Sequence, residues 1–158
     1  MREGADFTIV TYGVNINTAI EAAETLSHEG ISVEIIKLGQ INPIDIEIIS
    51  GSTAKTGRLM VLEECSGRGS VGEYIAASLV RGSSVQGSGK ASPKRGRANS
   101  KFSGASGNDN KDYAGNTPKM VILMNTGDTF ASCGEIGELR ECCGIDSKSV
   151  CEAVRENM

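Results

Sequence analysis

The sequence predicts a three-layer α/β/α sandwich around a mainly parallel sheet of at least four strands. Short runs rich in Ile, Val and Leu alternate along the chain with segments whose apolar residues recur every three or four positions. Glycine or proline stands at several of the changes between the two patterns, as it often does where strands and helices end. This alternation is typical of a parallel sheet that helices cover on both faces.

The first half of the chain is expected to contain three strands and three helices. The strands are expected at residues 7–12, 32–38 and 59–63. The helices are expected at residues 14–29, 43–55 and 69–80. Gly30 follows the first helix, as glycine commonly does, and Pro43 opens the second, at a position where proline is tolerated. Two parallel strands joined by a helix form a βαβ unit, whose crossover is almost always right-handed.

The composition changes between residues 81 and 119, and we expect a disordered loop there. The stretch holds seven Gly and seven Ser and almost no apolar residue, so it cannot bury enough surface to offset its ordering entropy. It carries eight of the sixteen Lys and Arg residues against two Asp, a net charge of +6 that leaves −10 for the rest. We therefore expect one domain, residues 1–158, interrupted by this basic loop. A nucleic-acid arm is the alternative, but only Phe102 and Tyr113 could stack on bases, so a solvated linker is favoured.

Regular structure is expected to resume after the loop. The apolar run M-V-I-L-M at residues 120–124 predicts a fourth strand. Two helices are expected to follow, at residues 134–142 and 148–156. Asp146 or Ser147 has the side chain needed to cap the last one.

The composition argues against a membrane, secreted or zinc-binding protein. The net charge of −4 favours neither nucleic acid nor a membrane surface as a partner. No apolar run approaches the roughly 18 residues of a membrane span, and the first residues lack the apolar core of a secretory signal. The five cysteines form no C-x-x-C pair and predict free thiols without a metal. We therefore expect a cytoplasmic protein.

A glycine turn after the third strand is the first candidate site. Gly67, Gly69 and Gly72 form a G-x-G-x-x-G pattern that contains Ser70 and opens a helix. Backbone amides at such a helix start can hold a phosphate or a carboxylate. A dinucleotide site also needs an acidic residue about 20 positions further on, which here falls in the basic loop. The pattern therefore favours a turn that packs the helix against the strand, with an anion contact as the alternative.

The adjacent Glu63 and Glu64 are the second candidate site, at the carboxyl end of the third strand, where ligands of open α/β sheets bind. Adjacent residues of a strand point to opposite faces, so the two carboxylates are not expected to flank one substrate atom. A structural or interface role is favoured over acid–base catalysis. Neither His28 nor the vicinal Cys142 and Cys143 are expected to be catalytic.

Several segments, taken in order, resemble the C-terminal domain of transketolase-like thiamine diphosphate enzymes, and most closely that of 1-deoxy-D-xylulose-5-phosphate synthase. They are R-E-G-A-D-F-T-I-V-T-Y-G (2–13), G-I-S-V-E-I-I-K-L-G-Q-I-N-P-I-D (30–45), L-M-V-L-E-E and G-R-G-S-V-G-E-Y-I-A (within 59–76), and G-D-T-F, C-G and G-I-D (within 127–146). The resemblance covers about residues 2–80 and 120–156. The basic loop departs from it, and so does Cys133, where the synthase pattern usually carries His.

The resemblance implies a non-catalytic C-terminal domain, or a split subunit, that serves assembly and interface packing in a thiamine-dependent transferase. In this family other domains hold thiamine diphosphate and magnesium, so the chain alone is expected to bind no cofactor and to be inactive. The expected partner is a separate chain with the thiamine-binding domains, or a second copy. Two alternatives stay open: a stand-alone module that binds a small anionic or regulatory ligand at the glycine turn, residues 67–72, and a remnant whose basic loop recruits an acidic partner.

The resemblance also implies an exposed edge of the sheet. The family places an antiparallel edge strand just before the R-E-G turn, which in this chain is residues 2–4. Since the sequence starts at that turn, the neighbouring strand is expected to have unpaired N–H and C=O groups. Self-association, or a partner that donates a strand, is expected there.

Overall fold

The computed structural model describes residues 2–84, 117–128 and 133–158, and it confirms the predicted sandwich around a parallel sheet. The strands are β1 (Phe7–Thr11), β2 (Val33–Lys37), β3 (Arg58–Leu62) and β4 (Met120–Met124). The helices are α1 (Asn15–His28), α2 (Ile46–Thr56), α3 (Val71–Ser84), α4 (Ile136–Cys143) and α5 (Ser147–Glu156).

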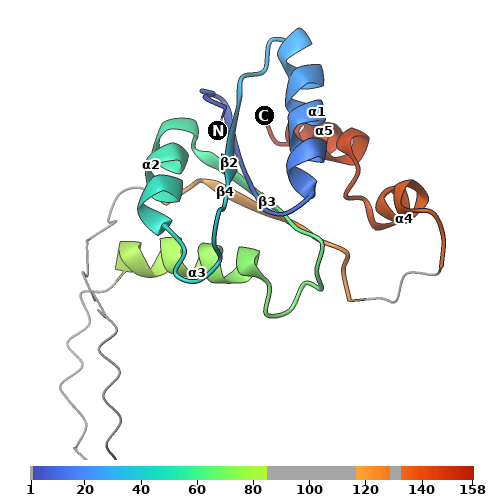
Figure 1. Ribbon diagram of the computed structural model, residues 1–158. Helices are drawn as coiled ribbons and strands as arrows, with labels where there is room; N and C mark the ends of the chain where they lie inside the picture. The colour runs from blue at the N-terminus through green and yellow to red at the C-terminus, as the bar shows by residue number, and fades with distance from the viewer. Residues whose placement is uncertain (1, 85–116, 129–132) are drawn as a thin grey trace, which may run out of the picture.

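The sheet has the order β2-β1-β3-β4, with every neighbouring pair parallel. Helices α1 and α5 pack on one face and α2 and α3 on the other, as Figure 1 shows. Each face has its own apolar cluster, and the central strand β1 is buried along its whole length. This burial on both faces explains why β1 lacks the alternation of polar and apolar residues that a half-exposed strand would have. None of the helices in the described part of the chain is both long and apolar enough to cross a bilayer.

Side-chain caps fix where two of the helices begin. The predicted start of α2 at Pro43 is wrong: the helix begins at Ile46, because the Asp45 side chain accepts a hydrogen bond from the backbone N–H of Ile48. Of the two predicted caps of α5, Asp146 and Ser147, the structure has Asp146, whose carboxylate accepts from the N–H groups of Lys148 and Ser149.

The predicted boundaries of the basic loop are too wide. Helix α3 continues to Ser84, so the expectation of disorder from residue 81 is wrong for its last turn. At the other end, the N–H of Lys119 donates to the carbonyl of Gly57 at 2.8 Å, immediately before β4. The remainder of the predicted loop, residues 85–116, lies outside the described residues.

Replacing residues 85–116 with a short Gly-Ser linker is expected to leave the melting temperature within a few degrees. Long surface insertions cost little stability, and this replacement keeps all of α3 and the Lys119 hydrogen bond. Thermal unfolding followed by circular dichroism measures the change. A fall of more than about 10 °C would mean that the segment packs on the core.

The N-terminal residues run antiparallel along the outer edge of β2. The N–H of Arg2 donates to the carbonyl of Ile35 at 3.2 Å, and the N–H of Ile35 donates back at 2.9 Å. Gly4 lies so close to β2 that a Cβ atom there would meet the backbone of Val33 and Glu34 at 2.2 Å. The expectation of a wholly unpaired edge next to the R-E-G turn is therefore wrong at Ile35, where Arg2 supplies both hydrogen bonds.

Candidate functional site

Glu63 lies at the carboxyl end of β3, and its side chain is completely buried. Its carboxylate accepts hydrogen bonds from the backbone N–H of Gly72 at 2.9 Å and of Val71 at 3.1 Å. The Tyr12 hydroxyl, just after β1, donates a third at 3.0 Å. A carboxylate at a helix N-terminus satisfies free amides and complements the helix dipole. Glu63 therefore ties β1, β3 and the start of α3 together.

Gly72 provides the space for this contact. A Cβ atom at position 72 would lie 2.6 Å from Oε1 of Glu63 and 2.9 Å from Cδ2 of Leu123, closer than packed atoms approach. The same Cβ atom would lie 3.3 Å from Cβ of Val61 on β3. This glycine is thus needed for the close approach of α3 to the sheet, which is the packing role that the glycine pattern favours.

Ser70 and Glu73 satisfy further amides at the start of α3. The N–H of Glu73 donates to Oγ of Ser70 at 3.1 Å, and the Glu73 carboxylate accepts from the N–H of Gly69 at 2.7 Å. Gly69 has a φ of 73°, a left-handed conformation that glycine adopts without strain. An external anion at Gly69 or Gly72 would have to displace a carboxylate of the chain itself.

Glu64 points away from this cluster and lies on the surface. Its carboxylate is 3.4 Å from Nη2 of Arg140 on α4, with side chains that are 47% and 22% exposed. An ion pair this exposed contributes about 0–1 kcal/mol. Because Glu63 contacts α3 while Glu64 contacts α4, the two carboxylates do not converge on one point.

Tyr12 and Cys65 lie beside the Glu63 carboxylate. Burial is the main reason that the pKa of Tyr12 lies above its usual value, and the hydrogen bond to Glu63 raises that pKa further. Burial, followed by contact with Glu63, raises the pKa of Cys65 to about 11. At neutral pH the Cys65 thiol is therefore protonated, which makes it a poor nucleophile.

Two loops meet beside Cys65 at the carboxyl edge of the sheet. The carbonyl of Cys65 accepts from both the N–H and the hydroxyl of Thr126, at 3.0 and 2.8 Å. An ion pair of 3.3 Å joins Arg68 to Asp128 across the same loops. The Gly67 backbone packs near Asp128 and Asn125. The loops after β3 and β4 are thus held to each other, and Gly67 belongs to their contact rather than to the start of α3.

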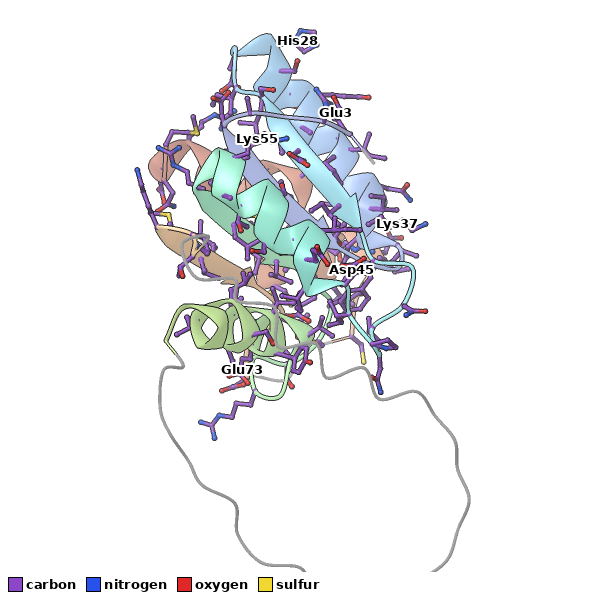
Figure 2. The ribbon with its side chains drawn as sticks, turned by 90° about the vertical axis from the view of Figure 1, so that its left-hand side faces the viewer. Glu3, His28, Lys37, Asp45, Lys55 and Glu73 are labelled. Carbon is purple, nitrogen blue, oxygen red and sulfur yellow. The ribbon has the colours of Figure 1, made fainter. Side chains whose placement is uncertain are left out.

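The remaining reactive side chains do not join this cluster. Figure 2 shows His28 at the end of α1, at the opposite end of the molecule from Glu73. Cys142 is exposed and Cys143 packs partly against the core, as expected of vicinal cysteines that share a helix end. Within the described ranges, no three His, Cys, Asp or Glu side chains gather closely enough to hold a metal ion.

Sequence reasoning missed Tyr12 and Glu73 as members of the cluster. Glu73 had a signal, because Ser70 and Glu73 have the spacing of a capping box, S-x-x-E, just before an apolar run. No sequence signal pointed to Tyr12, because its hydroxyl contacts Glu63 only through the pairing of β1 with β3 in the sheet.

A family model and two curated relatives match about half of this chain or somewhat more. The family model "Transketolase, C-terminal domain" matches residues 1–95. The beta subunit of acetoin:2,6-dichlorophenolindophenol oxidoreductase from Cupriavidus necator is 41% identical over 81 residues, which are 51% of this chain and 24% of that protein. The beta subunit of the pyruvate dehydrogenase E1 component from Staphylococcus epidermidis is 41% identical over 78 residues, 49% of this chain and 24% of its own length.

One solved structure resembles almost the whole chain. It is a split-gene transketolase in the form of an inactive tetramer of beta chains, with a TM-score of 0.69 and 25% sequence identity. The similarity covers 98% of this chain and 39% of that one. The chain thus spans about a quarter of the length of the curated relatives and about two fifths of this solved chain.

Proposed function

Because this chain belongs to the transketolase C-terminal domain family, we propose that it is a non-catalytic assembly domain, or a split subunit, of a thiamine diphosphate-dependent enzyme. The proposal rests on the hydrogen bonds that the Glu63 carboxylate accepts. Its two oxygens accept three hydrogen bonds from the chain itself, so the buried carboxylate holds α3 rather than facing a substrate. The polar residues of the candidate site therefore support a structural task.

Exposed apolar side chains at the carboxyl edge of the sheet support a role in interface packing. Val14 follows β1, Ile41 follows β2 and Tyr74 lies in the first turn of α3, with exposed fractions of 59, 52 and 57%. The carboxyl ends of parallel strands lie at one edge of a sheet, so these side chains belong to one side of the molecule. Large exposed apolar surfaces mark sites of contact with other proteins.

For the parent enzyme we propose a multi-chain dehydrogenase of the kind that the relatives' names describe, because both are beta subunits of 41% identity. A parent of the 1-deoxy-D-xylulose-5-phosphate synthase type is the second proposal, based on the motifs within residues 127–146. Turnover of pyruvate with an artificial electron acceptor by the assembled complex favours the first. Condensation of pyruvate with glyceraldehyde phosphate favours the second.

Thiamine diphosphate does not fit the candidate site of this chain. A diphosphate at the start of α3 would meet the carboxylates of Glu63 and Glu73, which already accept from the amides it would need. Among the described residues, no three His, Cys, Asp or Glu side chains lie close enough together to hold a metal ion. We therefore assign the cofactor to a cytoplasmic partner chain with the thiamine-binding domains.

The purified chain is expected to show no binding of thiamine diphosphate with magnesium at micromolar concentrations, whereas a complex captured from the native cell through a tag on the chain is expected to contain it. Calorimetry measures the first and mass spectrometry of the captured complex the second.

Substituting Ile41→Lys is expected to reduce capture of the complex about tenfold, because the charge would enter the interface. Ile20→Lys makes the same change at another exposed position, on α1, and is the control.

The possible outcomes separate the parts of the proposal. Micromolar binding of the cofactor to the chain alone would refute a non-catalytic role. Equal capture by the Ile41→Lys and Ile20→Lys variants would refute the carboxyl edge as the interface.

A further inference from the structure

The outer edge of β4 is an unprotected apolar edge of the sheet. In the described part of the chain, β4 has β3 on one side and no strand on the other. Its sequence, M-V-I-L-M, carries no charge, and none of its five side chains is fully buried. Edge strands of this kind pair with strands of other molecules, and proteins usually blunt them with charges or a covering segment.

The opposite edge of the sheet has such protection. β2 carries two charged residues, Glu34 and Lys37, and Glu34 forms an ion pair with Lys55 of α2. Arg2 also occupies the backbone groups of Ile35 on the outer side of β2. A further strand can therefore pair more readily with the uncharged edge of β4 than with the edge of β2.

The backbone of β4 determines which groups an added strand would meet. The carbonyl of Met124 points to β3, where it accepts from the N–H of Glu63 at 2.9 Å. Since the groups of successive residues in a strand point to alternate sides, those of Ile122 also face β3. The N–H and C=O groups of Val121 and Leu123 then face outward and are available to an added strand.

We propose that β4 pairs with β4 of a second copy of this chain, antiparallel across a two-fold axis at Ile122. In this register Val121 of one copy and Leu123 of the other exchange hydrogen bonds, which matches the outward groups. Ile122 then faces its own symmetry mate, and Met120 faces Met124. Every cross-strand pair is apolar, and all five residues of the strand take part. This pairing rests on the assembly role proposed above and specifies one of its interfaces.

The charge at the start of β4 favours the antiparallel direction. Lys119 precedes the strand, and the first charged residue after the strand is Asp128, which already forms an ion pair with Arg68. Antiparallel pairing places the two Lys119 side chains at opposite ends of the shared edge. Parallel pairing would instead place the two Lys119 side chains beside each other, where like charges repel.

Sedimentation equilibrium of the full chain is expected to show a dimer at tens to hundreds of micromolar. Substituting Val121→Lys is expected to weaken the dimer about tenfold or more, because each copy would place a charge in an apolar pair. Val121 is 36% exposed, so the fold should tolerate the change. Ile20→Lys makes the same substitution on α1 and is expected to leave the dissociation constant unchanged. Hydrogen exchange of the Val121 and Leu123 amides is expected to slow as the concentration rises.

Three outcomes would overturn the pairing. The first is a monomer at all these concentrations, including one in which both amides are protected because another segment of the chain covers β4. The second is a dimer that Val121→Lys leaves intact. The third is a dimer in which exchange at the two amides does not depend on concentration. A monomer that still captures a thiamine-containing complex would refute the β4 pairing alone and leave the proposed function standing.

Discussion

Substituting Gly72→Ala is expected to lower the free energy of unfolding by about 2–4 kcal/mol, with partial loss of the start of α3. The new Cβ would lie 2.6 Å from Oε1 of Glu63 and 2.9 Å from Cδ2 of Leu123. Both neighbours are held by the sheet, so relief of the clash requires α3 to move outward. That movement would lengthen the hydrogen bonds from Val71 and Gly72 to Glu63.

Gly51→Ala is a matched control, and its expected effect on the free energy of unfolding has the opposite sign. Gly51 also lies in a helix, α2, but a Cβ atom there would meet nothing within 4 Å. Alanine is the better helix former, so this variant is expected to gain about 0.5–1 kcal/mol. Urea denaturation followed by circular dichroism measures both. A Gly72→Ala variant as stable as the parent would mean that α3 does not depend on close contact with Glu63.

The layers of the fold were predictable because burial leaves a strong mark on the sequence. The β1 run F-T-I-V-T has no charged residue because both of its faces are covered. Its two Thr side chains form hydrogen bonds in the protein interior. Thr8, for example, hydrogen bonds to Ser52 and Thr56 of α2, both at 2.7 Å. A short run of β-branched residues followed by a helical pattern is enough to indicate such an arrangement.

Helix boundaries were less predictable because neighbouring residues can each suit the start or end of a helix. Pro43 suits the first turn of a helix because it has no N–H to leave unpaired, whereas Asp45 suits the cap because its side chain can accept from a free amide. In the structure Asp45 does so, at the N–H of Ile48, and the helix begins after it. The predicted end of α3 was too early because Gly and Ser at residues 82–84 suggested a loop. In the structure the helix continues through them.

The candidate site shows what sequence spacing cannot supply. Glu63 and Gly72 are nine residues apart, and both stood out in the sequence as separate features. Their contact arises because the chain reverses after β3 and α3 returns along the sheet, which brings the glycine over the carboxylate. The G-x-G-x-x-G pattern was consistent with an external anion, whereas the structure provides an internal one.

Substituting Glu63→Gln is expected to lower the free energy of unfolding by about 2–4 kcal/mol, although the side chain keeps its shape. The carboxylate accepts three hydrogen bonds, from Val71, Gly72 and Tyr12. The amide has a single acceptor oxygen, and its NH2 group would face at least one buried donor. An unsatisfied buried donor costs about 1–3 kcal/mol, and loss of the charge weakens the remaining bonds at the helix start.

Glu64→Gln is the control for Glu63→Gln, because it makes the same chemical change one residue away on an exposed side chain. Its ion pair with Arg140 is on the surface, so we expect a loss within about 1 kcal/mol. Tyr12→Phe removes one of the three donors and is expected to cost about 1 kcal/mol in the parent, but less in the Glu63→Gln background, where the charged acceptor is gone. Urea denaturation of the parent, of Tyr12→Phe, of Glu63→Gln and of the double variant gives this coupling. If Tyr12→Phe cost the same in both backgrounds, the hydrogen bond between Tyr12 and Glu63 would contribute nothing, and the link from β1 to α3 would have to lie elsewhere.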